Sequence, residues 1–347
     1  MASLFVDYLA RRLPLVEQAL AGSAGAPLAD APVASDLANY LYAPLGHFTA
    51  SGGKRVRPVL ALLGAEAVGG RAEDALSCAV AVELFQSAAL IHDDIADKSE
   101  LRRGEPCLYR TAGVGLATNA GDLALTRVFE VILDDEKLDD GRKARVLAEV
   151  VRMERHTLEG QALDLGWVRD ARWNVTPEDY TYMVDSKTAW YTVASPLALG
   201  ALAAGGSDET VKGLVEVGRL AGLAFQIQDD LLNLVGNAET QGKDFRSDIT
   251  EGKRTLAVVW ALAHLPEEGR SELVGILESH TTDARSLGRA VELIERGGGI
   301  EHCRDLARHH TEKAKEAART LAQGGHVTVE ARDLLRSMAD FFVERAS

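Results

Sequence analysis

Apolar residues recur along almost the whole chain at the three- and four-residue spacing of helices, and no stretch alternates cleanly between apolar and polar positions. Short segments rich in glycine and proline separate these periodic stretches. The pattern predicts helices at residues 3–21, 35–50, 54–68, 72–98, 114–135, 141–167, 177–204, 208–236, 254–264, 269–278, 284–296, 300–322 and 328–345. We therefore expect an all-α fold.

The breaks between the later helices are short, as in "GGSD", "LPEEG" and "RGGG", so we expect a single domain over residues 1–347. The longest uncharged run, "TAWYTVASPLALGALAAGG", is about as long as a membrane span. It is only mildly apolar and contains Pro196, which favours a buried core helix with a proline kink over stable membrane insertion. The first twenty residues are typical of an amphipathic helix rather than a signal peptide.

Charge and cysteine content narrow the possible partners. The 347 residues carry a net charge of −14, which argues against nucleic acid or an anionic membrane as the main partner. An anionic ligand would therefore need a local basic patch or metal ions. The three cysteines have no C-x-x-C spacing, so neither a disulfide framework nor a zinc site is indicated. A cytoplasmic protein is expected.

Two acidic clusters share one spacing, "DDIAD" at 93–97 and "DDLLN" at 229–233. On a helix, Asp93 and Asp97 lie one turn apart on one face, with Asp94 on its flank. Asp229 and Asp230 repeat this arrangement, and the last position of the second cluster is the amide of Asn233.

Both clusters follow strongly apolar helical stretches, where an unpaired carboxylate costs several kcal/mol. Paired oxygen ligands without histidine or cysteine are typical of Mg²⁺ holding a phosphorylated substrate. The alternative is that these are solvated aspartates on amphipathic helix faces. The repetition of one spacing after two apolar runs favours the metal interpretation.

Basic residues near the acidic clusters provide the complement that a phosphate needs. The segment "SGGKRVRP" (51–58) precedes a predicted helix, where glycines and free backbone N–H groups favour an anion. Further candidates are Arg102 and Arg103 in "LRRG", the pair Lys187–Thr188, and Lys243 and Lys253 in "GKDFRSDITEGKRT". Each alone is typical of a solvated surface charge, and their nearness to the acidic clusters favours a binding role.

The ordered set "GGKRVRP", "LIHDDIAD" with "RRG", Gly121–Asp122, "EGQALDL", "KTAWYT" and "FQIQDDLLN…GKDFRSDITEGKRT" resembles the trans-isoprenyl diphosphate synthases over roughly residues 35–345. The resemblance implies an isoprenoid-synthase-type helical bundle around a deep central cavity, and a homodimer. It also implies Mg²⁺-dependent condensation of isopentenyl diphosphate with an allylic diphosphate.

The resemblance also implies roles for individual residues. Asp93, Asp97 and Asp229 would bind the Mg²⁺ ions, three per active site, with Asp94 and Asp230 in the outer shell. The allylic diphosphate would contact Arg102, Lys187 and Lys243, with Lys253 close by. Isopentenyl diphosphate would be held by Gly53, Lys54, Arg57, Arg103 and Gln86, the last standing where many bacterial relatives have histidine. Thr188 and Gln226 would line the reaction centre.

Three features depart from the commonest family pattern: Asn233 replaces an aspartate, Arg246 stands where glycine is common, and the first acidic motif has the short form. Product length in this family depends on the helix before that motif. Ala88 and Ala89, one turn before Asp93, are small, whereas Leu84 and Phe85 are bulky and begin about 12 Å from Asp93. This depth predicts geranylgeranyl diphosphate. The alternative is that Phe85 simply packs in the core.

The sequence does not exclude other functions that the same fold could have. These are a farnesyl or longer polyprenyl diphosphate synthase, prenyl transfer to a non-isoprenoid acceptor, and a catalytically silent subunit that regulates a partner. The complete isopentenyl diphosphate set argues against another acceptor. The three aspartates of the first motif argue against a silent subunit.

Overall fold

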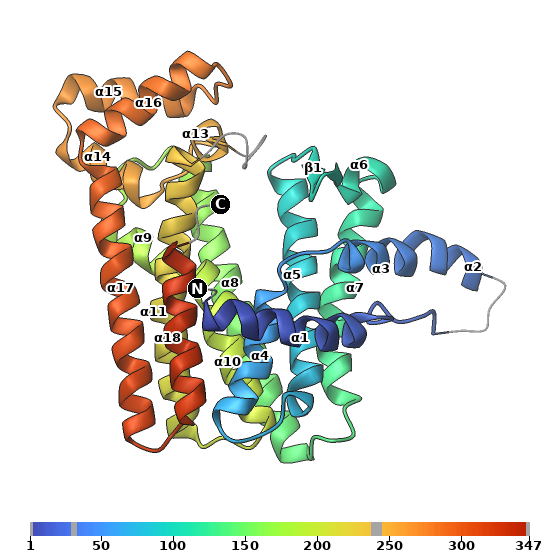
Figure 1. The fold of residues 1–347 in the computed structure, drawn as a ribbon. Coiled ribbons are helices and arrows are strands. Elements are labelled where there is room, and N and C mark those ends of the chain that lie inside the picture. The colour runs from blue at the N-terminus through green and yellow to red at the C-terminus, as the bar shows by residue number, and fades with distance from the viewer. Residues whose placement is uncertain (1–2, 29–32, 237–244, 345–347) are drawn as a thin grey trace. The chain divides into compact units, whose positions relative to one another are not determined.

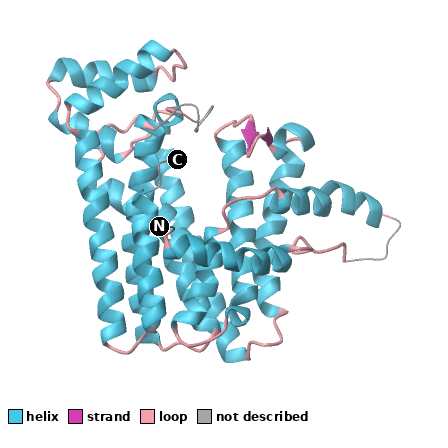
Figure 2. Cartoon of the chain, in the orientation of Figure 1, coloured by secondary structure: helices cyan, strands magenta, loops and turns pink. Residues whose placement is uncertain are grey.

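The computed structural model describes residues 3–28, 33–236 and 245–344, which form two compact units. The N-terminal unit consists of residues 1–151, 195–212 and 325–331, and the C-terminal unit of residues 152–194, 213–324 and 332–347, as far as these are described. Figures 1 and 2 show that helices make up both units. The all-α fold class is therefore confirmed, and the single-domain interpretation stays a prediction.

The N-terminal unit is built around α5, which packs along α7, and α4, which packs along α10. Its elements are α1 (Leu4–Leu20), α2 (Ala34–Leu37), the π-helical η1 (Ala38–Tyr42), α3 (Ala43–Ala50), α4 (Val56–Ala67), the 3₁₀ turn η2 (Ala72–Ala75), α5 (Leu76–Ala96), β1 (Leu101–Arg102), β2 (Glu105–Pro106), α6 (Leu108–Ala112), α7 (Val114–Leu133) and α10 (Ser195–Ala203). The backbones of α4 and α10 are in contact at Gly64. A Cβ added to this glycine would lie 2.1 Å from the carbonyl oxygen of Leu197, too close for any other residue to fit without a shift.

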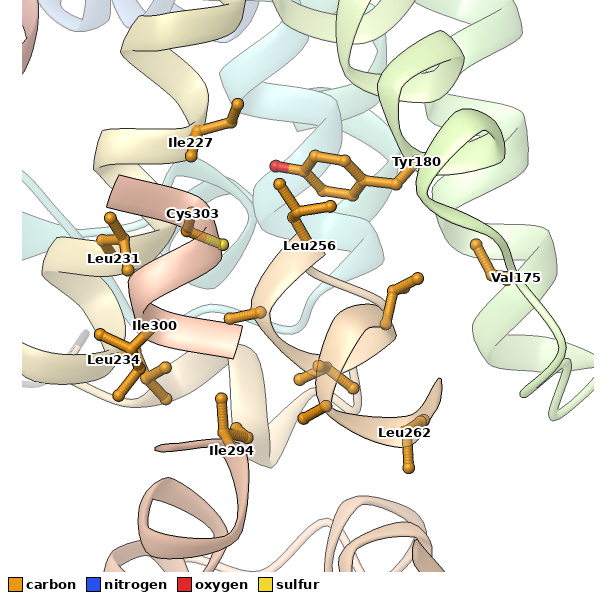
Figure 3. Packing of buried hydrophobic residues seen from close by; sticks show 14 of the residues in the cluster. Val175, Tyr180, Ile227, Leu231, Leu234, Leu256, Leu262, Ile294, Ile300 and Cys303 are labelled. Atoms are coloured by element: carbon orange, nitrogen blue, oxygen red, sulfur yellow. The ribbon is translucent and has the colours of Figure 1, made fainter. Parts of the chain in front are cut away.

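The C-terminal unit is a bundle with its own apolar core. Figure 3 shows Tyr180, Leu256 and Cys303, from three different helices, packed within this core. The elements of this unit are α9 (Pro177–Val184), the π-helical η3 (Asp185–Ala194), α13 (Ser247–Thr250), α14 (Leu256–His264), α15 (Glu267–Glu278), α16 (Ala284–Arg296), α17 (Gly299–Gln323) and α18 (Val329–Glu344). Two long helices, α8 (Asp140–Arg169) and α11 (Asp208–Val235), have residues in both units, and the first turn of α18 belongs to the N-terminal unit.

The long helices lie where the apolar periodicity predicts them, and the short elements do not follow from it. The antiparallel ribbon of β1 and β2 and the helices α6 and α13 have two to five residues each, too few to show a period. The expected kink near Pro196 takes the form of η3, a wide π-helical segment that ends directly before α10. A π-helical widening accommodates a proline, which lacks an N–H and collides with the preceding turn.

Among the described residues, one helical stretch, Ala72–Ala96, is long and apolar enough to cross a membrane by composition. In the most apolar 18-residue part of this stretch, 67% is buried inside the protein. Such burial is typical of a core helix.

Glu154 on α8 makes a testable contribution to stability. Its Oε1 is buried without a hydrogen-bond partner among the described residues, and burial raises the pKa of its carboxyl from 4.5 to about 7. Because the folded state holds the proton more tightly, stability falls as pH rises from about 4.5 through 7. We expect Glu154→Gln to raise the free energy of unfolding by about 1–2 kcal/mol at pH 8, allowing for partial exposure, and by less at pH 5.

The measurement is urea unfolding at the two pH values. Glu159→Gln is the control, because Glu159 lies on the same helix, has a side chain that is 43% exposed and is paired with Arg155. It should show no gain at either pH. A gain for Glu154→Gln of the same size at pH 5 and pH 8 would contradict the burial of an ionised carboxylate.

Candidate active site

The first acidic motif lies at the C-terminal end of α5. Asp94 is 1% exposed and accepts hydrogen bonds from Nε of Arg102, at 2.9 Å, and from its Nη2. Asp93 is half-buried, and Asp97, which follows the last helical residue, is exposed. The flanking aspartate therefore faces the protein and holds Arg102, while the pair on one face stays more accessible.

The basic segment forms a tight loop before α4. Gly52 and Gly53 have φ values of 92° and 135°, which side chains rarely adopt, so the chain can reverse here. A Cβ on Gly53 would lie 3.3 Å from Nη2 of Arg103, whose Nη1 donates a hydrogen bond to Oγ of Ser51 at 3.2 Å. The loop and the arginine from the β1–β2 ribbon thus form one structure.

Positive charge is concentrated around this loop. Lys54 is exposed, and Arg57 is half-buried beside it. The pKa of Arg103 is lowered by burial, and Arg55, Arg102 and Arg57 lower it further although Glu83 opposes them. Such crowding of guanidinium groups is costly without an anion and therefore suits a diphosphate. Gln86 is half-buried on α5.

The C-terminal unit contains a polar pocket of about 150 Å³ between α8, α9, η3 and α11. Four carboxylates and three cationic side chains line it, together with neutral residues. The lining residues are Asp164, Tyr180, Met183, Val184, Lys187, Thr188, Gln226, Asp229, Asp230, Asn233, Asp248, Lys253, Arg254 and Thr255. Except for Lys243, which lies outside the described residues, the pocket brings together the site residues predicted for this unit.

Close backbone packing fixes η3 at the wall of this pocket. A Cβ on Gly160 of α8 would lie 2.3 Å from the backbone nitrogen of Lys187, and one on Gly222 of α11 would lie 2.6 Å from Cα of Ala189. Nζ of Lys187 donates a hydrogen bond to Oδ2 of Asp164 on α8 at 2.6 Å. The glycine of the "EGQALDL" motif therefore admits the π-helical backbone, and its aspartate orients the lysine.

Asp230 is held by neutral donors rather than by a cation. The hydroxyl of Tyr180 donates to its Oδ2, and Nε2 of Gln226 donates to its Oδ1, both at 2.7 Å. Burial, reinforced by the charge of Asp248, raises the pKa of Asp230 to about 8, although both hydrogen bonds oppose this. Burial first, and the neighbouring carboxylate second, thus favour the protonated form of Asp230.

Burial raises, and nearby lysines lower, the pKa values of two further carboxyls, those of Asp248 and Asp164. Burial raises the pKa of Asp248 to about 6, while Lys253, whose Nζ lies 3.5 Å from its Oδ1, counteracts the shift. The pKa of Asp164 is also subject to burial, but Lys187 and then Lys253 hold it below its usual value. A divalent cation would neutralise the excess of carboxylates, and a phosphate bound to that cation could pair with the lysines.

Two of the departures from the commonest family pattern, Asn233 and Arg246, have local structural reasons. Nδ2 of Asn233 donates to Oγ of Ser247 at 3.1 Å, and its Oδ1 accepts from the backbone N–H of Asp248 at 3.3 Å. An aspartate at 233 would add a further negative charge beside Asp248. Arg246 has a φ of 63°, the left-handed region that glycine adopts without strain, which explains why glycine suits this position.

Asp93 and Asp97 in the N-terminal unit, and Asp229 in the C-terminal unit, each offer oxygen atoms alone, which fits a hard divalent cation. Within the described part of the chain, no three carboxylate, imidazole or thiolate groups gather closely enough to hold a metal by themselves. Carboxylates of the protein would supply part of the coordination of a bound ion. Substrate phosphates and water would supply the rest, as is usual for Mg²⁺.

Sequence reasoning did not assign Asp164, Tyr180, Asp248 or Arg254 to the site. Asp164 and Asp248 fall within motifs that carry the resemblance, and an acidic residue inside such a motif was an available signal. Arg254 also falls within such a motif, directly after Lys253, so a charged residue in a motif was an available signal for it too. Tyr180 carried no such signal, since its position depends on α9 packing beside α11. The predicted length-determining residues lie on α5, where Leu84, Phe85 and Ala88 are buried and Ala89 is half-buried.

The sequence profile of the polyprenyl synthetase family matches residues 38–294. The chain is 42% identical to the short chain isoprenyl diphosphate synthase of Methanothermobacter thermautotrophicus, over 86% of this chain and 88% of that protein. It is 36% identical to the geranylfarnesyl diphosphate synthase of Natronomonas pharaonis, over 88% of this chain and 90% of that protein.

Solved structures agree with these similarities. The geranylgeranyl pyrophosphate synthetase of Pyrococcus horikoshii superposes with a TM-score of 0.86 at 33% identity, covering 98% of this chain and 99% of that one. The geranylgeranyl pyrophosphate synthase of Corynebacterium glutamicum, complexed with isoprenyl diphosphate and magnesium, superposes with a TM-score of 0.83 at 29% identity, covering 99% of each chain.

Proposed function

The chain belongs to the polyprenyl synthetase family and is a trans-isoprenyl diphosphate synthase, and from this premise we propose that its main product is geranylgeranyl diphosphate. The substrates would be isopentenyl diphosphate and dimethylallyl, geranyl or farnesyl diphosphate, and the cofactor Mg²⁺, with three ions per site. The observation that supports these substrates and this cofactor is the pocket of the C-terminal unit, where Asp229 lies with Lys187, Lys253 and Gln226.

The residues suit a reaction without a protein nucleophile. Mg²⁺, held by Asp93, Asp97 and Asp229, would supply charge that stabilises the departing pyrophosphate. Arg102, Lys187 and Lys253 add fixed positive charge for the same leaving group. Lys54, Arg57 and Arg103 bind isopentenyl diphosphate and orient its double bond toward the allylic carbon. The proton lost at the end goes to pyrophosphate, the strongest base available, while Thr188 and Gln226 line the reaction centre.

The proposed product length rests on α5. Ala88 and Ala89, one turn before Asp93, have small side chains, and the buried Leu84 and Phe85 would stop the growing tail after a further turn. Relatives differ in the products that their names state, from geranylgeranyl to geranylfarnesyl diphosphate. Membership of the family therefore does not fix the product length, and we propose that the side chains on α5 decide it in this chain.

The test is an assay with purified protein, Mg²⁺, isopentenyl diphosphate and each allylic diphosphate in turn, with products separated by chain length. We expect dimethylallyl, geranyl and farnesyl diphosphate all to be extended to a C20 product, and no product in the presence of EDTA. No condensation with any allylic substrate would overturn the enzyme assignment. A main product other than C20 would overturn the chain length alone.

We also propose that the protein is a cytoplasmic homodimer. In support, α8 exposes Leu158 and Leu165 to 66% and 43%, seven residues apart on one face, as in helices that pair. The three cysteines, Cys78, Cys107 and Cys303, are free and buried, which suits a reducing compartment.

The Leu158→Glu variant tests the homodimer. A charge in an apolar interface is expected to raise the dissociation constant by about 100-fold or more, measured by light scattering over a dilution series. Val329→Glu is the control, because Val329 is 56% exposed at the start of α18. Equal dissociation constants for the wild-type protein, Leu158→Glu and Val329→Glu would contradict an interface on α8.

A further inference from the structure

Arg55 belongs to the basic loop by sequence but faces the protein interior. It is 3% exposed, and all three guanidinium nitrogens have protein acceptors. Nε donates to Oε1 of Glu17 on α1 at 2.8 Å, Nη2 donates to the carbonyl oxygen of Thr49 on α3 at 2.7 Å, and Nη1 donates to Oε1 of Glu83 on α5. Arg55 is thus not available to an anion, unlike the exposed Lys54 beside it.

The backbone of Arg55 is strained. Its φ of 48° and ψ of 32° lie in the left-handed region, two residues after Gly53 and directly before α4. A side chain in this conformation persists only where surrounding contacts hold it. The three hydrogen bonds to three different helices provide that restraint.

Glu83 is as deeply buried as its partner. It is 1% exposed, and its Oε2 has no hydrogen-bond partner within the described structure. Removal of the guanidinium would leave this carboxylate buried without a neutralising charge, which is strongly unfavourable. The pair therefore fixes the loop to α5 as well as filling space. Glu83 also attracts Arg103, the residue that contacts Ser51 at the other side of the loop.

We propose that Arg55 is a positioning residue whose buried pairing with Glu83 holds Lys54 and Arg57 in place to bind the diphosphate of isopentenyl diphosphate. The inference rests on the proposed function, in which those residues hold that substrate. It gives α5 a further role. Glu83 anchors the basic loop and Asp94 anchors Arg102, eleven residues or about 16 Å further along the same helix. One rigid element thereby sets the spacing of the charged groups in this unit.

The test is the Arg55→Lys variant of the full chain, with both substrates varied in steady-state kinetics. Lysine keeps the charge but cannot pair with all three acceptors. We expect the KM for isopentenyl diphosphate to rise about 10- to 100-fold. The KM for farnesyl diphosphate and kcat should change by less than about threefold. Calorimetric binding of isopentenyl diphosphate to the enzyme without an allylic substrate should weaken in parallel.

Arg12→Lys is the matched control. Arg12 pairs with Glu66 between α1 and α4 in the same unit, apart from the loop. Its replacement should lower the melting temperature without a specific rise in the KM for isopentenyl diphosphate. This separates a positioning role from general stability.

Either of two results for folded Arg55→Lys overturns the inference: an unchanged KM for isopentenyl diphosphate, or equal rises in the KM of both substrates. If this variant does not fold, Glu17→Gln decides. Glu17 has a side chain that is 44% exposed, so its loss relaxes the loop mildly, and we expect a rise of about threefold in the same KM alone. No rise overturns the inference. Failure of the proposed function is distinct, because the wild-type protein would then not condense the substrates.

Discussion

Asp93→Ala and Asp229→Ala are each expected to lower kcat by about 1000-fold, equivalent to about 4 kcal/mol of transition-state stabilisation. Both carboxylates are predicted to hold Mg²⁺, which stabilises charge as pyrophosphate leaves. Their loss should also raise the Mg²⁺ concentration needed for half-maximal activity. Turnover is measured with farnesyl diphosphate and isopentenyl diphosphate over a Mg²⁺ titration.

The structure adds a graded expectation for the flanking aspartates. Asp94 is committed to Arg102, and Asp230 to Tyr180 and Gln226, so both act through neighbours. We expect Asp94→Asn and Asp230→Asn to cost about 10- to 100-fold, less than the metal-binding pair.

Asp305→Ala is the control for these variants, because Asp305 is an exposed aspartate on α17 that pairs with Arg308. It should keep kcat within about twofold of wild type. Undiminished turnover of Asp93→Ala would contradict the site assigned from the sequence.

The second large effect concerns product length. Phe85→Ala is expected to lengthen the main product beyond C20 by at least one C5 unit, because it removes the bulky side chain two turns before Asp93. Ala88→Phe is expected to shorten it to C15, because a ring one turn before Asp93 blocks the growing tail. Products are identified by chromatography of the dephosphorylated alcohols.

Val80→Ala is the control on the same helix. Val80 is buried but lies five residues before Phe85, about 140° around the helix, so its truncation leaves the predicted floor in place. The product of this control should be unchanged. Unaltered lengths in both Phe85→Ala and Ala88→Phe would mean that α5 does not form the floor, and that Phe85 serves packing alone.

Much of the architecture was predictable because it is local. A helix buries one face, and this imposes a three- to four-residue period that is visible without tertiary contacts. The long helices α5, α8, α11 and α17 follow from that period. The acidic pairs follow from the same geometry, since a spacing of four places Asp93 and Asp97 on one face and leaves Asp94 on the flank.

Other features depend on contacts between residues that are distant in sequence. The pairing of Lys187 with Asp164 and of Tyr180 with Asp230 brings separate helices together, and no spacing in the chain encodes it. The sequence groups Arg55 with the basic loop, and only the packing of α1, α3 and α5 shows that it faces inward.

The chain alone thus determined which segments are helical, where the acidic and basic motifs lie and which family they resemble, because these depend on period and order. Tertiary structure decided which charges are buried and paired, and which stay accessible to a ligand. The reason is physical: the cost of burying a charge depends on its neighbours in space, and the fold chooses those neighbours.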